Sequence, residues 1–210
     1  MTKGRSVRIS LKKQPQQARS TELVAAILEA AVQVLAKEGA QRFTTARVAE
    51  KAGVSIGSLY QYFPNKAAIL FRLQSDEWQR MAVLLRTILE DAGRPPLERL
   101  RALVHAFVRS ECEEAEMRVA LNDTAPLYRD APETREAQAA GYRILRLFIH
   151  EALPGSAQET RELAVDLIMT TMSRVAKSFS ESPRTAAEID AYADAMADMF
   201  CAYLKALGRD

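Results

Sequence analysis

The chain has 210 residues, of which 48% are hydrophobic and 27% are charged. This is the ordinary balance of a globular protein with a sizeable core, and it excludes collagen-like, wholly disordered and disulfide-stapled proteins. The net charge of +2 hides an asymmetry: residues up to Lys66 include 11 Lys/Arg and 4 Asp/Glu, whereas the remainder includes 18 and 23. A basic front on an acidic body predicts contact with nucleic acid at one end of the chain.

The sequence predicts neither a leader nor a membrane anchor. Its first twenty residues are basic, but no apolar run follows them where a signal peptide would need one. No stretch approaches the roughly 18 uninterrupted apolar residues of a membrane span, because Glu29 and Gln33 interrupt the most apolar early segment. We therefore expect a cytoplasmic protein without a membrane partner.

Residue types that carry chemistry are few and scattered. Cys112 and Cys201 lie far apart, and neither they nor His105 and His150 have neighbours at metal-ligand spacing. We interpret both cysteines as free thiols of a reducing compartment. The chain has no nucleophile-elbow glycine pattern and no phosphate-binding glycine loop. The sequence therefore predicts no catalytic residue, metal site or cofactor, and a protein that is not an enzyme.

Periodicity predicts an all-α fold. Glycine and proline are scarce, with eight of each, and the segments between them follow helical rather than strand spacing. We divide the chain into a flexible basic arm (1–18), a helix-turn-helix domain (19–65) and a helical body (66–210). Helices are expected over about 21–37, 45–52, 56–63, 66–91, 97–115, 133–153, 157–180 and 186–207, with a less regular stretch over 117–129.

Two short helices near the N-terminus form the most informative segment. Thr44 and Ser55 are suitable N-caps for them, and Gly53 lies in the turn between. Pro64 ends the second helix because proline cannot donate the backbone hydrogen bond that would extend it. Two short helices joined by a turn of three or four residues containing glycine are the helix-turn-helix motif.

The second short helix has an outer face suited to a DNA groove. With Leu59 and Phe63 turned inward, Gly57 and Gln61 point outward. A small residue permits close approach, and an amide side chain can form a bidentate contact with adenine. Hydroxyl and cationic side chains nearby are placed to contact phosphates: these are Thr45, Arg47, Tyr60, Tyr62 and Lys66. The alternative is that this face is ordinary surface, but the adjoining basic arm favours DNA.

The segment from about Arg19 to Leu70 strongly resembles the DNA-binding domain of the TetR family of bacterial repressors. The resemblance is carried by Lys37-Glu38-Gly39, Phe43-Thr44-Thr45, Val48-Ala49, Ala52-Gly53-Val54-Ser55, Gly57-Ser58-Leu59-Tyr60-Gln61-Tyr62-Phe63 and Asn65-Lys66. It implies a three-helix reading domain in a homodimer that binds double-stranded operator DNA. It also implies that Thr45, Ser55, Ile56, Gly57, Ser58, Tyr60, Gln61, Tyr62 and Lys66 face DNA.

The arm before Arg19 is longer and more basic than many family members need. Arg5 and Arg8 could follow the DNA backbone or enter a minor groove. A tail without fixed contacts is an equal alternative.

The resemblance makes residues 66–210 a ligand-binding and dimerisation domain. Reading two half-sites requires a dimer, and we expect its interface on apolar stripes of the last two helices: Val175, Phe179, Ile189, Met196, Phe200 and Leu204. The alternative is that these stripes face the core of their own chain.

A small-molecule effector is implied by the same resemblance. Aromatic, methionine and histidine side chains of the body are candidates to line its pocket: Phe71, Trp78, Met81, His105, Phe107, Met117, Tyr142, Phe148, Met169 and Met172. Each is more often plain core. The sequence of this domain contains no cluster of charged residues that would indicate a charged ligand, so a hydrophobic or amphipathic effector is favoured.

The sequence predicts a ligand-released transcriptional repressor. A DNA-binding nucleoid or cell-division protein without an effector would keep the same motif, and so would an activator. The sequence does not separate these alternatives.

Overall fold

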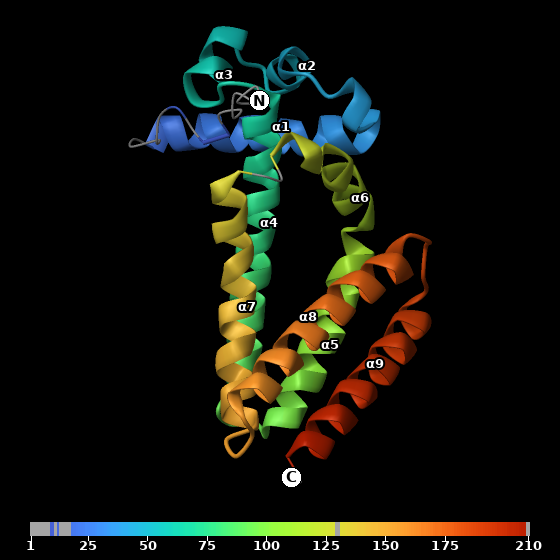
Figure 1. The fold of residues 1–210 in the computed structure, drawn as a ribbon. Coiled ribbons are helices and arrows are strands. Elements are labelled where there is room, and N and C mark those ends of the chain that lie inside the picture. The colour runs from blue at the N-terminus through green and yellow to red at the C-terminus, as the bar shows by residue number, and fades with distance from the viewer. Residues whose placement is uncertain (1–8, 11, 13–17, 129–130, 209–210) are drawn as a thin grey trace, which may run out of the picture. The chain divides into compact units, whose positions relative to one another are not determined.

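The computed structural model describes residues 9, 10, 12, 18–128 and 131–208. Every regular element within these ranges is helical, which confirms the all-α prediction (Figure 1). The helices are α1 (Ala18–Arg42), α2 (Thr45–Lys51), α3 (Ile56–Tyr62), α4 (Lys66–Leu89), α5 (Pro96–Glu113), α6 (Ala115–Thr124), α7 (Pro132–Ala152), α8 (Gln158–Ser180) and α9 (Ala186–Leu207), with a 3₁₀ turn η1 (Ala125–Leu127) after α6.

The stretch over 117–129 was expected to be irregular. In the structure its first part is regular, because helix α6 continues to Thr124 and the 3₁₀ turn that contains Pro126 follows it.

The chain forms two compact units. Unit 1 comprises Met1–Glu77 and Glu116–Ala137, and unit 2 comprises Trp78–Ala115 and Gln138–Asp210. These units divide the chain differently from the expected domains, because the start of α4 and all of α6 after Ala115 pack with the N-terminal helices. Ile69 and Leu70 of α4 and Leu121 of α6 are buried in the same core cluster as α1.

The three N-terminal helices of unit 1 are fixed by capping and by a small apolar core. Ile27, Ala30 and Val34 of α1 are buried at the helical spacing that the sequence predicts. Gly39 has φ 75° and breaks α1 near its end, and Gly53 has φ 67° in the turn after α2. Both conformations are in the left-handed region, which glycine adopts without the steric cost of a Cβ atom.

The turn η1 and the first turns of α7 are tied to the rest of unit 1 by polar and aromatic contacts. The Phe71 and Tyr128 rings lie 5.8 Å apart between centroids. The Tyr128 hydroxyl donates to the carbonyl of Leu121 at 3.2 Å, and the Thr134 hydroxyl donates to the carbonyl of Tyr128 at 2.7 Å. Burial raises the pKa of Tyr128, so the phenol stays protonated as a donor. These contacts explain why a segment far along the chain belongs to unit 1.

In unit 2, helix α5 packs against both α8 and α9. A ladder of polar contacts joins α5 to α9: Arg101 pairs with Asp194 and Asp198, His105 lies within hydrogen-bond distance of Asp194 at 3.0 Å, and Arg109 pairs with Asp190 at 2.8 Å. The basic side chains and the carboxylates each recur every four residues, so each set lies along one face of its helix. The ladder is consistent with the register in which the two helices pack.

A second polar contact of unit 2 joins three helices. Arg99 of α5 is almost fully buried and donates to the carbonyl of Leu89 at 2.6 Å, at the C-terminal end of α4. Its guanidinium also pairs with Glu151 of α7 and lies 5.5 Å from the centroid of the Phe148 ring. Arg99 therefore donates a hydrogen bond to a carbonyl in the last turn of α4, where no backbone N–H of the helix is available as a partner.

No helix in the part of the chain that the structure describes is both long enough and apolar enough to cross a membrane. Cys112 and Cys201 are free thiols, the first partly buried and the second buried.

Candidate nucleic-acid interface

Hydroxyl side chains start both helices of the helix-turn-helix. The Thr44 side chain accepts from the backbone N–H of Arg47 at 3.3 Å and caps α2. The Ser55 hydroxyl accepts from the backbone N–H of Ser58 at 3.0 Å and caps α3. Each satisfies an amide that the first helical turn leaves without a partner. Both caps are as the sequence predicts.

Helix α3 presents four exposed residues on one face. Ile56, Gly57, Tyr60 and Gln61 are exposed and recur at the spacing of one helical turn; we call them the reading face. Leu59 is fully buried on the opposite side. A Cβ atom at Gly57 would meet only the Ser55 hydroxyl, at 3.7 Å, so the missing side chain leaves open space above the helix. This face has the size and polarity that a major groove admits.

Tyr60 links the reading face to α2. Its hydroxyl lies 3.0 Å from the Thr45 hydroxyl, and either group can be the donor. Thr45 is the first residue of α2, so the bond joins the N-terminal end of one helix to the other helix. The contact fixes a phenol and a hydroxyl side by side, both among the residues expected to face DNA.

Tyr62 does not share the reading face. Only 7% of it is exposed, because it lies on the same side of α3 as Leu59 and packs in the core of unit 1. Most of the Tyr62 side chain therefore contributes to the core of unit 1, because two tyrosines that flank Gln61 cannot both lie on its side of a helix. A DNA contact by the Tyr62 hydroxyl stays a prediction.

The expected phosphate contacts are exposed to different degrees. Lys66, the first residue of α4, is exposed, and Asn65 caps that helix by accepting from the backbone N–H of Ala68 at 2.9 Å. Arg47 is exposed but pairs with Glu38 of α1, so a phosphate would compete with a carboxylate for its guanidinium. Ser55 is exposed, and Ser58 is partly covered and shares a 2.8 Å hydrogen bond with Ser55.

Part of the basic arm is packed against unit 1. Ile9 is only 3% exposed and belongs to the core cluster of this unit. The backbone N–H of Lys12 donates to the carbonyl of Tyr62 at 2.9 Å, and its Nζ donates to the carbonyl of Tyr60 at 3.2 Å. These two residues of the expected flexible arm thus have fixed contacts, whereas Arg5 and Arg8 lie outside the described residues. An isoleucine within a polar stretch was the signal that could have shown the anchor.

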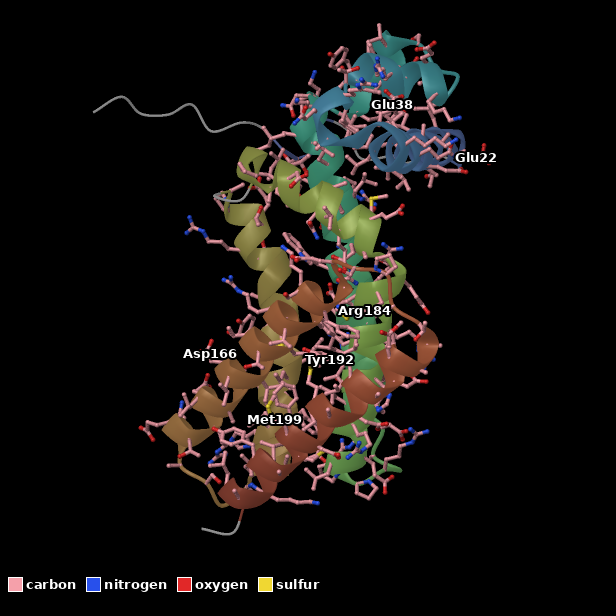
Figure 2. All side chains as sticks on the ribbon, turned by 90° about the vertical axis from the view of Figure 1, so that its right-hand side faces the viewer. Glu22, Glu38, Asp166, Arg184, Tyr192 and Met199 are labelled. Carbon is pink, nitrogen blue, oxygen red and sulfur yellow. The ribbon has the colours of Figure 1, made fainter. Side chains whose placement is uncertain are left out.

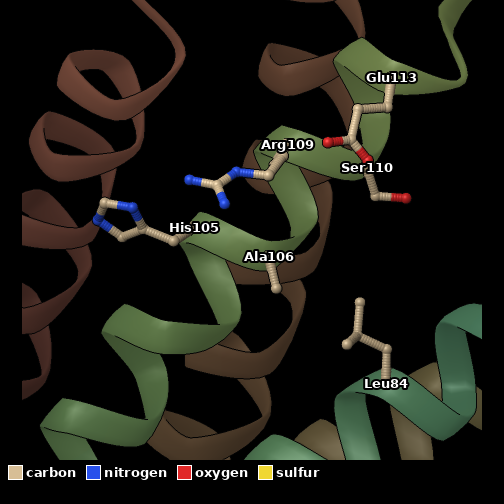
Figure 3. Close-up of a pocket in the computed structure, with 6 residues that line it drawn as sticks. All are labelled: Leu84, His105, Ala106, Arg109, Ser110 and Glu113. Atoms are coloured by element: carbon tan, nitrogen blue, oxygen red, sulfur yellow. The ribbon is translucent and has the colours of Figure 1, made fainter. Parts of the chain in front are cut away.

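Unit 2 has a pocket of 410 Å³ on helix α5, lined by Leu84, His105, Ala106, Arg109, Ser110 and Glu113. Leu84 reaches from α4 toward Ala106 and Ser110, while His105 and Arg109 lie along another side of α5 (Figure 3). The pocket thus has an apolar part and a charged rim. His105 and Arg109 also belong to the ladder with α9.

Of the side chains expected to line a pocket, His105 alone is among the lining residues of this one. Phe71 and Met117 pack against the core of unit 1. The larger group packs in or against the core of unit 2, as ordinary core side chains: Met81, Phe107, Tyr142, Phe148, Met169 and Met172. Trp78 is partly exposed at the start of unit 2. Apolar type alone did not separate core from pocket, because both are lined by the same residues.

The residues expected at a dimer interface are engaged within a single chain. Met196, Phe200 and Leu204 of α9 are 5%, 2% and 2% exposed and lie in the core of unit 2. Val175, Phe179 and Ile189 are partly buried against the same core. In this single chain the stripe of large apolar side chains on α9 therefore faces the core of unit 2, which is the alternative that the sequence left open. An interface between two chains stays a prediction.

Exposed apolar side chains lie elsewhere on the last two helices. Leu163 and Leu167 of α8 are 61% and 44% exposed, and Met199 of α9 is 51% exposed. Figure 2 views the face where α8 and α9 lie, with Asp166 labelled on α8 and Tyr192 and Met199 on α9. On α9, Ala195, Ala202 and Ala206 are also exposed at helical spacing around Met199. Large apolar groups exposed in a series are typical of a contact surface.

Comparison with known proteins agrees with these features. The family described as "Bacterial regulatory proteins, tetR family" matches residues 27–73, and the family described as "Tetracyclin repressor-like, C-terminal domain" matches residues 95–207. The chain is 28% identical to the HTH-type transcriptional repressor KstR of Rhodococcus jostii over 144 residues. This aligned region covers 69% of this chain and 66% of KstR.

Two further proteins are similar over different extents. The nucleoid occlusion factor SlmA of Vibrio campbellii is 37% identical over 83 residues, 39% of this chain and 42% of SlmA. The chain thus spans less than two thirds of the length of these curated relatives. The solved structure of the transcriptional regulator FadR of Bacillus subtilis in complex with stearoyl-CoA superposes with a TM-score of 0.69 at 17% identity, over 84% of this chain and 97% of FadR. With matches at both ends of the chain and a helix-turn-helix in unit 1, the protein belongs to the TetR family of bacterial DNA-binding transcriptional regulators.

Proposed function

We propose that this protein is a repressor that binds a palindromic operator as a homodimer and leaves it when a small molecule binds unit 2. The observation that carries the DNA-binding part is the reading face of α3, exposed on one side of a helix whose other side is buried. Gly57 permits close approach to base edges, and Gln61 supplies an amide for an adenine. Thr45, Tyr60 and Lys66 are the proposed phosphate contacts.

Selection of bound duplexes from a random DNA pool by the purified protein tests this proposal. Enrichment of one palindrome, with half-sites about one helical turn or a multiple apart, is the expected result. Salt-sensitive binding without any enriched sequence would contradict specific readout. That outcome favours the second candidate function, a nucleoid or cell-division protein, for which the similarity to SlmA over 83 residues is the supporting observation.

The proposed dimer interface is the exposed apolar face of α8 and α9. It consists of Leu163 and Leu167 with Met199 and its neighbouring alanines. Small residues around one large side chain allow two helices to approach closely and interdigitate. Because α9 buries its stripe of larger side chains against α5, the second apolar stripe, through Met199, is the one available to a partner chain.

The proposed effector is amphipathic. The pocket on α5 combines Leu84 and Ala106 with a charged rim, in which Glu113 lies beside an Arg109 that pairs with Asp190, and its volume lies in the range of small-ligand sites. Helix α4 contains residues of both units, so a ligand that prefers one arrangement of α4 would change the DNA-bound population. The structural similarity to FadR, solved with stearoyl-CoA, makes a long-chain acyl-CoA the first compound to test.

Fluorescence polarisation of the labelled operator complex tests the effector. Stearoyl-CoA is expected to release the operator, whereas free coenzyme A at the same concentration leaves it bound. Release by both compounds would indicate a polyanion effect rather than an effector site. Release by neither removes acyl-CoA from the proposal and leaves the DNA-binding part intact.

A further inference from the structure

The segment before α1 contacts the C-terminal end of the reading helix. Helix α3 ends at Tyr62, so the carbonyls of its last turn have no partner within the helix. Lys12 supplies two donors there: its backbone N–H bonds to the carbonyl of Tyr62 at 2.9 Å, and its ammonium bonds to the carbonyl of Tyr60 at 3.2 Å. A cation at a helix C-terminus is also favoured by the helix dipole.

A buried side chain holds this segment in place. Ile9, three residues before Lys12, is 3% exposed and lies in the core cluster that also contains Leu59, Tyr62 and Phe63. Burial of an isoleucine supplies a favourable transfer free energy, so packing of Ile9 adds to the hydrogen bonds of Lys12. Ile9 thus shares a core with the inner side of α3, and Lys12 binds the terminal carbonyls of that helix.

We propose that Lys12 is a positioning residue for DNA readout, with Ile9 as its anchor. Both carbonyls that Lys12 binds belong to residues that flank Gln61, and Tyr60 is itself bonded to Thr45 of α2. The C-terminal end of α3 is therefore held from two directions, by α2 through a side chain and by the N-terminal segment through the backbone. Lys12 acts through the orientation of the reading face and not by binding a phosphate. This inference rests on the proposed function, since it assigns a role in that same interface.

The competing role for Lys12 is that of one more phosphate-binding cation in a basic segment. The two roles differ in a measurable quantity. A residue that neutralises a phosphate contributes about one unit to the slope of log affinity against log salt. A residue that orients the reading face leaves that slope unchanged and alters the ratio of affinities for the operator and for a duplex with a changed base.

The test compares Lys12→Met, Lys12→Arg and a control, Lys37→Met, which removes the same charge from an exposed site on α1. Affinity is measured against the selected operator and against an operator with the base pair read by Gln61 replaced, across a salt series. Lys12→Met is expected to weaken operator binding roughly 3- to 10-fold, the scale of one exposed hydrogen bond, with little change on the altered duplex and an unchanged slope. Lys12→Arg, which keeps a cationic donor, is expected to restore most of the preference.

A slope lowered by about one unit with preference retained would overturn the inference in favour of phosphate binding. Equal affinity and preference in Lys12→Met and the wild type would overturn it as well. A wild type that prefers no duplex contradicts the proposed function instead. In that case amide hydrogen exchange of the free protein still decides the anchoring. Faster exchange over residues 59–63 in Ile9→Ser and Lys12→Met supports it, and unchanged exchange overturns it.

Discussion

Gln61 and Lys66 lie within five residues of each other and are expected to contribute to DNA binding in different ways. Gln61 lies on the exposed face of α3, and Lys66 is exposed at the start of α4. An amide can form two directed hydrogen bonds to one base edge, whereas an ammonium is a point charge that attracts any phosphate. Substitutions at these two positions should therefore separate sequence preference from general affinity.

Gln61→Ala is expected to relax base preference at one position in each half-site. Removal of a bidentate hydrogen bond costs about 1–3 kcal/mol of discrimination against the wrong base, while binding to random duplexes changes little. Competition between the operator and single-base variants measures this. An unchanged preference at every position would remove Gln61 from the reading role.

Lys66→Ala is expected to weaken binding to specific and random duplexes alike. The slope of log affinity against log salt should fall by about one unit for each phosphate that the protein no longer neutralises. Titration of a labelled duplex at several salt concentrations measures the slope. Lys37→Ala is the matched control, since Lys37 is exposed on α1 and belongs to neither α2 nor α3. A slope equal to that of the wild type would count against phosphate binding by Lys66.

Among the helices of unit 2, the contact between α5 and α7 predicts how stability responds to acid. Hydrogen bonds from Arg99 hold the pKa of Glu151 below its ordinary value. A carboxyl with a lowered pKa in the folded state stabilises the protein above the ordinary carboxyl pKa, and that stabilisation disappears as pH falls through the folded value. Because the Glu151 side chain is 55% exposed, screening by solvent keeps the effect small.

Glu151→Gln should therefore reduce the free energy of unfolding at pH 7 and flatten its decline between about pH 5 and pH 3. Urea unfolding followed by circular dichroism across that pH range gives both quantities. Glu162→Gln, in an exposed pair with Arg146, is the control, since its side chain is similarly accessible but its arginine partner is not buried. Curves of equal steepness in the wild type and Glu151→Gln would contradict the role of this pair.

For the molecule as a whole, reading two half-sites requires two chains. The stripe through Met196, Phe200 and Leu204 is occupied within one chain, so the surface proposed for a partner is the one through Met199 and Leu163. A charge placed there would be buried without a partner in the dimer, at a cost of several kcal/mol, but would remain in solvent in the monomer.

Met199→Asp is expected to yield a folded monomer that binds the operator weakly. Sedimentation velocity measures the mass, and circular dichroism checks that helical content is kept. Val83→Asp is the matched control, because Val83 is also an exposed apolar residue, on α4, and its substitution should leave the dimer unchanged. An intact Met199→Asp dimer would show that the interface lies elsewhere.

Local sequence patterns were enough to predict the all-α class, the bounds of most helices and the helix-turn-helix with its caps at Thr44 and Ser55. These features are set by interactions within a few residues along the chain, such as a hydroxyl reaching the amide three residues on or a glycine in a left-handed turn. The likeness to the TetR family depended on the same short segment. Helix periodicity also identified α9 as amphipathic.

Which apolar side chains face a core and which remain exposed became clear from the folded structure alone. Spacing predicts a face but not its partner, so it did not show that α5 covers the stripe on α9 or that Phe148 packs in the core of unit 2. The burial of Tyr62 and Ile9 and the hydrogen bonds of Lys12 to α3 likewise join segments that are distant in the sequence. Such pairings depend on free energies of burial summed over the folded unit, which no local pattern contains.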